Sequence, residues 1–104
     1  MTPYKAYYEC YRKCKRIPEL EDIISTSPQY SYYYALNIIR GPWEEGEDII
    51  SKHPYWSYKY ARNIIKGPFE KCHHVIFNSE YKENYIHFLK RKKYDLNKIS
   101  EWLL

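Results

Sequence analysis

The chain carries one pattern of apolar and polar residues twice, in residues 23–48 and 49–74. When the two segments are aligned from their first residues, they are identical at 14 of 26 positions. Within each copy, apolar residues recur three and four positions apart, which is the spacing of one face of an α-helix. A period of this length is typical of repeat proteins, in which each unit buries its apolar face against its neighbours. We therefore predict an all-α, α-solenoid-like array of helical hairpins, with long and short helices alternating.

Proline and glycine mark where the helices of each copy begin and end. Ser27-Pro28 and His53-Pro54 each place a residue at a cap position before a proline that suits the first helical turn, so we expect a long helix over 28–40 and its counterpart over 54–66. Gly41 and Gly67 follow these helices and are expected to adopt the left-handed conformation that ends them. A short helix with an acidic first turn should then follow Gly41-Pro42, and Gly67-Pro68 repeats the same punctuation.

The pattern continues in weaker form towards both ends of the chain. Tyr4 and Tyr8 precede Tyr30 and Tyr34 by the same offset that relates the two clear copies, so they align with the apolar arc of the long helix and indicate a degenerate first long helix. We expect one domain in which the degenerate repeats 4–22 and 75–104 flank the clear repeats 23–48 and 49–74, because end repeats must face water on one side. A final short helix is predicted after Asp95, with four apolar residues: Leu96, Ile99, Trp102 and Leu103.

A helical projection of residues 28–40 separates a broad apolar arc from a narrower outward arc. The outward arc holds Tyr33, Leu36, Asn37 and Arg40. Tyr33 and Leu36 stand where the second copy has the charged Lys59 and Arg62. They either lie beneath the N-terminal helix or form an apolar patch that binds a partner. The second copy has an asparagine, Asn63, at the position that corresponds to Asn37. This recurrence suggests that the side chain is bonded to a loop or a neighbouring helix.

The net charge of +4 is unevenly distributed along the chain. Residues 17–51 sum to −6, whereas residues 52–93 sum to +7, and such asymmetry concerns partners rather than fold. Two basic clusters end predicted long helices: Arg12, Lys13, Lys15, Arg16 and Lys90, Arg91, Lys92, Lys93. With tyrosines beside them they could hold nucleic acid, although cations at helix C-termini are favourable in any case. Nucleic acid is therefore the alternative to a protein partner.

The sequence contains no recognisable catalytic motif, and we expect a non-enzymatic protein without a cofactor. Five residues invite a zinc interpretation: Cys10, Cys14, Cys72, His73 and His74. Their spacing is not that of a zinc finger or ribbon, and cysteine also packs as a small apolar residue, so no metal is predicted. An odd number of cysteines and the lack of a long apolar run predict a soluble, cytoplasmic protein without a membrane partner.

The repeat unit resembles short tyrosine-rich helical repeats of bacteriophages and large DNA viruses. The resemblance is carried by Ser27–Ala35 and by Asn37–Glu47, and Pro42 departs from the pattern. It implies a viral origin and a small protein that binds and inhibits or redirects a host protein. Aromatic and arginine side chains anchor most protein interfaces. The expected partner-binding residues are Tyr33, Leu36, Arg40, Glu44, Glu45, Glu47 and Asp48. The ends of such an array are exposed and can stack on a second copy of the chain, so a homodimer is a further possible assembly.

Overall fold

The computed structural model describes residues 1–94, so the short helix predicted after Asp95 lies outside the described residues. Seventy-one per cent of the described residues are helical, and none of them forms a strand. The all-α prediction is confirmed. No described helix is both long and apolar enough to cross a membrane.

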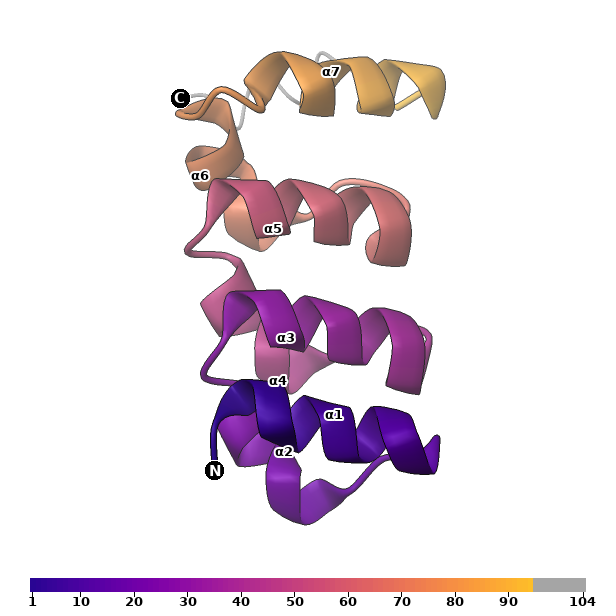
Figure 1. Cartoon of the computed structure of the whole chain (residues 1–104). Helices are drawn as coiled ribbons and strands as arrows, with labels where there is room; N and C mark the ends of the chain where they lie inside the picture. The colour runs from indigo at the N-terminus through magenta and orange to yellow at the C-terminus, as the bar shows by residue number, and fades with distance from the viewer. Residues whose placement is uncertain (95–104) are drawn as a thin grey trace. The chain divides into compact units, whose positions relative to one another are not determined.

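The chain divides into two compact units, Met1–Ile50 and Ser51–Leu104. Unit 1 alternates long and short helices, as predicted, and its two long helices run side by side (Figure 1). Its elements are α1 (Pro3–Lys13), α2 (Pro18–Ile24), α3 (Pro28–Tyr34), the π-helix η1 (Ala35–Ile39) that continues α3, and α4 (Glu44–Ile50).

The described part of unit 2 repeats the alternation of long and short helices (Figure 1). Its elements are α5 (Pro54–Tyr60), the π-helix η2 (Ala61–Ile65), the 3-10 helix η3 (Glu70–Cys72), α6 (His73–Phe77) and α7 (Lys82–Arg91). Short helix α6 packs against both α5 and α7.

Side-chain caps define where the long helices of unit 1 begin. The Ser27 hydroxyl accepts a hydrogen bond from the Tyr30 amide at 3.1 Å, as its position before Pro28 predicts. The last long helix, α7, begins at Lys82 and has no side-chain cap, so Ser79 does not cap it in the way that Ser27 caps α3. Ser79 accepts from the Tyr81 amide at 3.1 Å, so it holds the turn before the helix instead.

The left-handed residues that end the long helices are not the glycines. Arg40 has φ 62° and Lys66 has φ 60°, whereas Gly41 and Gly67 have negative φ. The reason is the π-turn: in the second copy the Ala61 carbonyl accepts from the Lys66 amide at 2.7 Å and from the Gly67 amide at 3.2 Å. The chain therefore reverses at the residue that closes the widened turn, one position earlier than expected.

The register of α1 also differs from the prediction. This helix runs from the cap Thr2 to the left-handed Cys14, and the clear repeat runs from the cap Ser27 to the left-handed Arg40, so α1 is shorter by one residue. The additional residue of the clear repeat is accommodated by the π-turn, which α1 lacks. The fully buried residues of α1 are therefore Ala6 and Cys10, 25 rather than 26 positions before the equally buried Ser31 and Ala35.

The core of unit 1 lies where α2 and α4 meet α3. The rings of Tyr34 and Trp43 are 4.7 Å apart and almost completely buried, and the Ser31 hydroxyl donates to the Ile24 carbonyl at 3.1 Å. The corresponding pair in unit 2 is Tyr60 and Phe69, whose ring centroids are 5.0 Å apart. Its small buried residues at the corresponding positions are Ser57 and Ala61. The predicted apolar arc of the long helix is thus confirmed in both copies.

Candidate protein-binding surface

One side of α1 exposes three tyrosines: Tyr4, Tyr8 and Tyr11. Their spacing places them along one helical stripe, and each is 50–55% exposed. The rings of Tyr4 and Tyr8 stack at 6.2 Å with an interplanar angle of 19°. They face outward because the shifted register of α1 turns Ala6 and Cys10 towards the core. We refer to these three residues as the tyrosine stripe.

The first two tyrosines of the stripe line a groove between α1 and α2, with a volume of about 380 Å³. Met1, Ile17 and Leu20 complete its apolar surface. Three charged residues also line it: Lys5, Glu9 and Lys13. The groove is therefore apolar on its walls and contains two cations and one carboxylate.

The third tyrosine of the stripe lines a second hollow, of about 540 Å³, between the end of α1 and η1. Its other lining residues are Cys14, Asn37, Ile38 and Arg40. The Asn37 amide nitrogen donates to the Tyr7 hydroxyl at 2.9 Å, so the expected bond from this asparagine to a neighbouring helix is confirmed. Burial raises the pKa of Tyr7 above its ordinary value.

The structure separates the residues of the predicted outward patch. Tyr33 is half-buried beneath α1, where its ring contacts those of Tyr7 at 6.0 Å and Tyr30 at 5.9 Å. Leu36 is 37% exposed, and the exposed Arg40 joins the tyrosine stripe through the second hollow. Of the two interpretations of this patch, packing under the N-terminal helix describes Tyr33, and an open surface describes Leu36.

The predicted acidic residues lie on the short helix α4. Glu44, Glu45 and Asp48 are exposed, and Glu47 is half-buried. None of the four lines the hollow that contains Arg40. The sequence placed them near the patch because they follow it along the chain, but α4 packs on α3.

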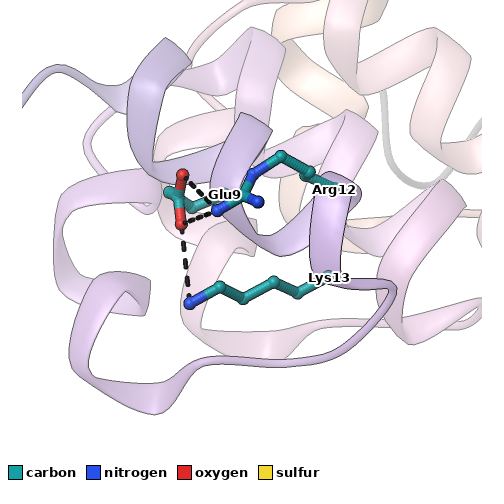
Figure 2. Close-up of polar contacts among 3 residues, drawn as sticks. All are labelled: Glu9, Arg12 and Lys13. Atoms are coloured by element: carbon teal, nitrogen blue, oxygen red, sulfur yellow. Dashed lines mark hydrogen bonds and ion pairs between the residues drawn. The ribbon is translucent and has the colours of Figure 1, made fainter.

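The cations of the first basic cluster are mostly paired within their own unit. Figure 2 shows Arg12 and Lys13 reaching the Glu9 carboxylate, at 3.1 and 3.6 Å. The hydrogen bond from Arg12 lowers the pKa of Glu9 below its usual value. Arg16 donates to both carboxylate oxygens of Glu21, at 2.9 and 3.0 Å. Lys15 is exposed.

The second basic cluster is exposed at the C-terminal end of α7. It comprises Lys90, Arg91, Lys92 and Lys93, and the last of these is left-handed, with φ 62°. Arg91 and Lys92 line hollows together with Arg62 of η2. The structure thus distinguishes two clusters that look alike in sequence.

Two of the three cysteines and one histidine are buried: Cys10, Cys72 and His73. Among residues 1–94, no group of three or more His, Cys, Asp or Glu side chains is arranged to hold a metal ion. Cys10 is buried, which raises the pKa of its thiol, and the buried Cys72 thiol donates to the Phe69 carbonyl at 3.1 Å. Desolvation lowers the pKa of His73 to about 4, so this side chain is neutral at pH 7.

The sequence alignment at an offset of 26 matches Tyr4 and Tyr8 of the stripe to the core-face residues Tyr30 and Tyr34, and the structure shows that this match is wrong. A usable signal was present, because Thr2-Pro3 matches Ser27-Pro28 at an offset of 25, whereas the two clear copies match at an offset of 26. Aligning the helix starts, instead of the tyrosines, places Ala6 and Cys10 at the buried positions and turns Tyr4 and Tyr8 outward.

Comparison of the chain with known protein families, with curated proteins and with solved structures finds no match.

Proposed function

We propose that this chain is a non-enzymatic protein-binding module that contacts its partner through the tyrosine stripe of unit 1. The observation that carries the proposal is the continuity of the surface. Tyr4, Tyr8 and Tyr11 stand half-exposed in one row that joins two hollows. Tyrosine gives a large contact area from few rotatable bonds, and it is enriched among the residues that dominate binding energy. Tyr4 and Tyr8 also stack on each other, which reduces the entropy lost when a partner covers them.

The lining of the groove between α1 and α2 supports an amphipathic partner segment. Its walls are apolar and its cations are Lys5 and Lys13, and Lys13 already contacts Glu9. An amphipathic helix with an apolar ridge and a flanking carboxylate fits this arrangement, because the ridge fills the groove and the carboxylate meets Lys5. The resemblance to viral repeat proteins makes a host protein the proposed source of that helix, and inhibition or redirection of that protein the proposed effect.

Site-specific photocrosslinking tests this proposal. A photoreactive phenylalanine analogue replaces Tyr8 in one variant and Tyr55 in another, since both tyrosines are exposed but lie in different units. In lysate of the cells that the protein acts in, we expect one protein to be crosslinked from position 8 and not from position 55. Equal crosslinking from both positions, or from neither, would reject the tyrosine stripe as the binding surface.

Calorimetry with the purified partner then measures the contribution of the stripe. Replacing Tyr4→Ser and Tyr8→Ser together should weaken binding at least about tenfold, because two central aromatic contacts are lost. Tyr55→Ser is the matched control and should leave the affinity unchanged. The proposal fails if the double variant binds like the original protein while retaining its helical circular-dichroism signal.

A further inference from the structure

Unit 2 contains a groove lined by cations from two different helices. The groove lies between α5–η2 and α7 and consists of two hollows, of about 370 and 280 Å³. Both hollows are lined by Arg62, Phe88 and Arg91, so they are adjoining parts of one surface. Lys92 lines the smaller hollow and His87 the larger one. We refer to this surface as the basic groove.

Within the described residues, the cations of the basic groove are not neutralised by ion pairs. Over residues 1–94, Arg12, Lys13 and Arg16 form ion pairs, whereas Arg62, Arg91 and Lys92 form none. Arg62 has a polar contact with the Tyr58 hydroxyl, at 3.4 Å, which orients the guanidinium without neutralising its charge. One carboxylate, Glu83, lines the larger hollow.

Unit 2 as a whole also carries a net positive charge. Residues 51–104 contain 11 Lys and Arg against five Asp and Glu, a net charge of +6, whereas residues 1–50 have a net charge of −2. Lys90 and Lys93 extend the row of cations beyond the groove. Several cations along one surface match a ligand with regularly spaced negative charges better than a single carboxylate.

We propose that the basic groove binds a nucleic-acid strand through its backbone phosphates, with Arg62, Arg91 and Lys92 as the principal contacts. One guanidinium group can donate two parallel hydrogen bonds to the oxygens of one phosphate. Two arginines from different helices can therefore hold successive phosphates. Phe88 and Tyr58 are 7% and 8% exposed and form the floor of the groove rather than stacking platforms. Recognition therefore relies on phosphates and not on bases, and it is independent of sequence.

This activity is separate from the protein-binding surface, which lies in unit 1. Asn84 supplies an exposed amide group in the larger hollow and can donate to a phosphate oxygen. The groove also refines the nucleic-acid alternative drawn from the sequence. It retains Arg91 and Lys92 from one cluster, adds Arg62 from the second repeat, and omits the cluster at residues 12–16, where three of the four cations are paired.

Fluorescence anisotropy with the full-length protein and a labelled 20-nucleotide oligo(dT) tests the proposal. Neutralising three phosphates should make affinity fall roughly twentyfold between 50 and 200 mM salt. Arg62→Gln with Arg91→Gln should lower the affinity at least tenfold, and Arg91→Gln alone gives a second, milder variant that keeps the Arg62–Tyr58 contact. Lys15→Gln with Lys52→Gln removes the same charge from exposed positions outside the groove and should change the affinity less than twofold.

Four outcomes would overturn the proposal. The first is absence of oligo(dT) binding at 50 mM salt, and the second is an equal loss of affinity in the groove and control variants. The third is tighter binding of a labelled poly-glutamate peptide of matched length, which would identify an acidic protein segment as the ligand. The fourth is concentration-dependent dimerisation at low salt that the Arg62→Gln and Arg91→Gln changes abolish, which would identify a second copy of this chain as the occupant. Selective, salt-dependent loss in the groove variants alone supports it.

Discussion

Tyr33 and Leu36 lie three residues apart on one long helix, and the structure gives them different surroundings. The ring of Tyr33 contacts those of Tyr7, Tyr30 and Tyr32, within 6.0 Å in each case. Leu36 is 37% exposed. The same helical projection assigned both to the outward arc, because a projection cannot show how far α1 extends over α3.

Tyr33→Ala should lower the free energy of unfolding by about 1–3 kcal/mol, since it removes a half-buried ring and its aromatic contacts. Leu36→Ala is the matched control and should change it by less than about 0.5 kcal/mol. Urea denaturation followed by circular dichroism measures both. Equal effects of the two variants would show that Tyr33 is not packed against α1 in solution.

His73 gives a pH dependence that belongs to a single residue. Its side chain is 3% exposed, and desolvation lowers its pKa to about 4 from an ordinary value of 6.5. Between these two values the unfolded chain binds a proton that the folded chain does not. The stabilisation is therefore complete above pH 6.5 and is lost as the pH falls towards 4, by up to about 3 kcal/mol.

His73→Phe should accordingly flatten the decrease in unfolding free energy between pH 7 and pH 4.5. The exposed neighbour His74 offers the control, because His74→Gln leaves the buried imidazole in place and should retain most of the decrease. Denaturant titrations at the two pH values provide the comparison. A decrease of the same size in the His73→Phe variant would assign the acid sensitivity to other groups.

At the scale of the elements, the two copies fill the same space between short and long helix in different ways. Unit 1 uses the large Trp43 with Gly46, and unit 2 uses the smaller Phe69 with Cys72 at the corresponding positions of the second copy. A Cβ at Gly46 would lie 2.6 Å from the Trp43 ring and 3.0 Å from the Ser31 Cβ, so no larger residue fits beside the tryptophan. Gly46 therefore permits the close approach of α4 to α3, a role that the sequence did not reveal.

Transplanting the unit 2 pair into unit 1 tests this exchange of volume. Gly46→Cys alone should cost about 1–3 kcal/mol through overpacking, and Trp43→Phe alone should cost about 1–2 kcal/mol through a cavity. The double variant should be more stable than the sum of the two predicts, by at least about 0.5 kcal/mol. Strictly additive unfolding free energies would mean that the two side chains do not share one site.

At the scale of the whole molecule, charge is divided between the two units. The cations near the end of α1 are paired with Glu9 and Glu21, whereas those of the basic groove are not paired within the described residues. Unit 2 therefore experiences net self-repulsion that added salt screens, since the Debye length falls to about 10 Å at 0.1 M.

The melting temperature should accordingly rise by a few degrees between 20 and 200 mM sodium chloride. Lys90→Gln with Lys92→Gln should reduce this rise, because the repulsion is already partly removed. Differential scanning calorimetry at the two salt concentrations measures it. A melting temperature that falls with salt would show that the surface ion pairs of unit 1 dominate instead.

The sequence by itself determined the helical class, the alternation of long and short helices, and the residues of the central core. These follow from local rules, because spacing of three and four residues places Ser31 on one face with Tyr34 and Ala35, and Ser27-Pro28 starts a helix wherever it stands. Only the tertiary structure decided the left-handed ends at Arg40 and Lys66, the packing of the Tyr33 ring beneath α1, and the meeting of Arg62 and Arg91 in one groove. The physical reason is that a π-turn changes the register by one residue, and that packing and grooves depend on which helices lie side by side. Neither is encoded in the repeat period.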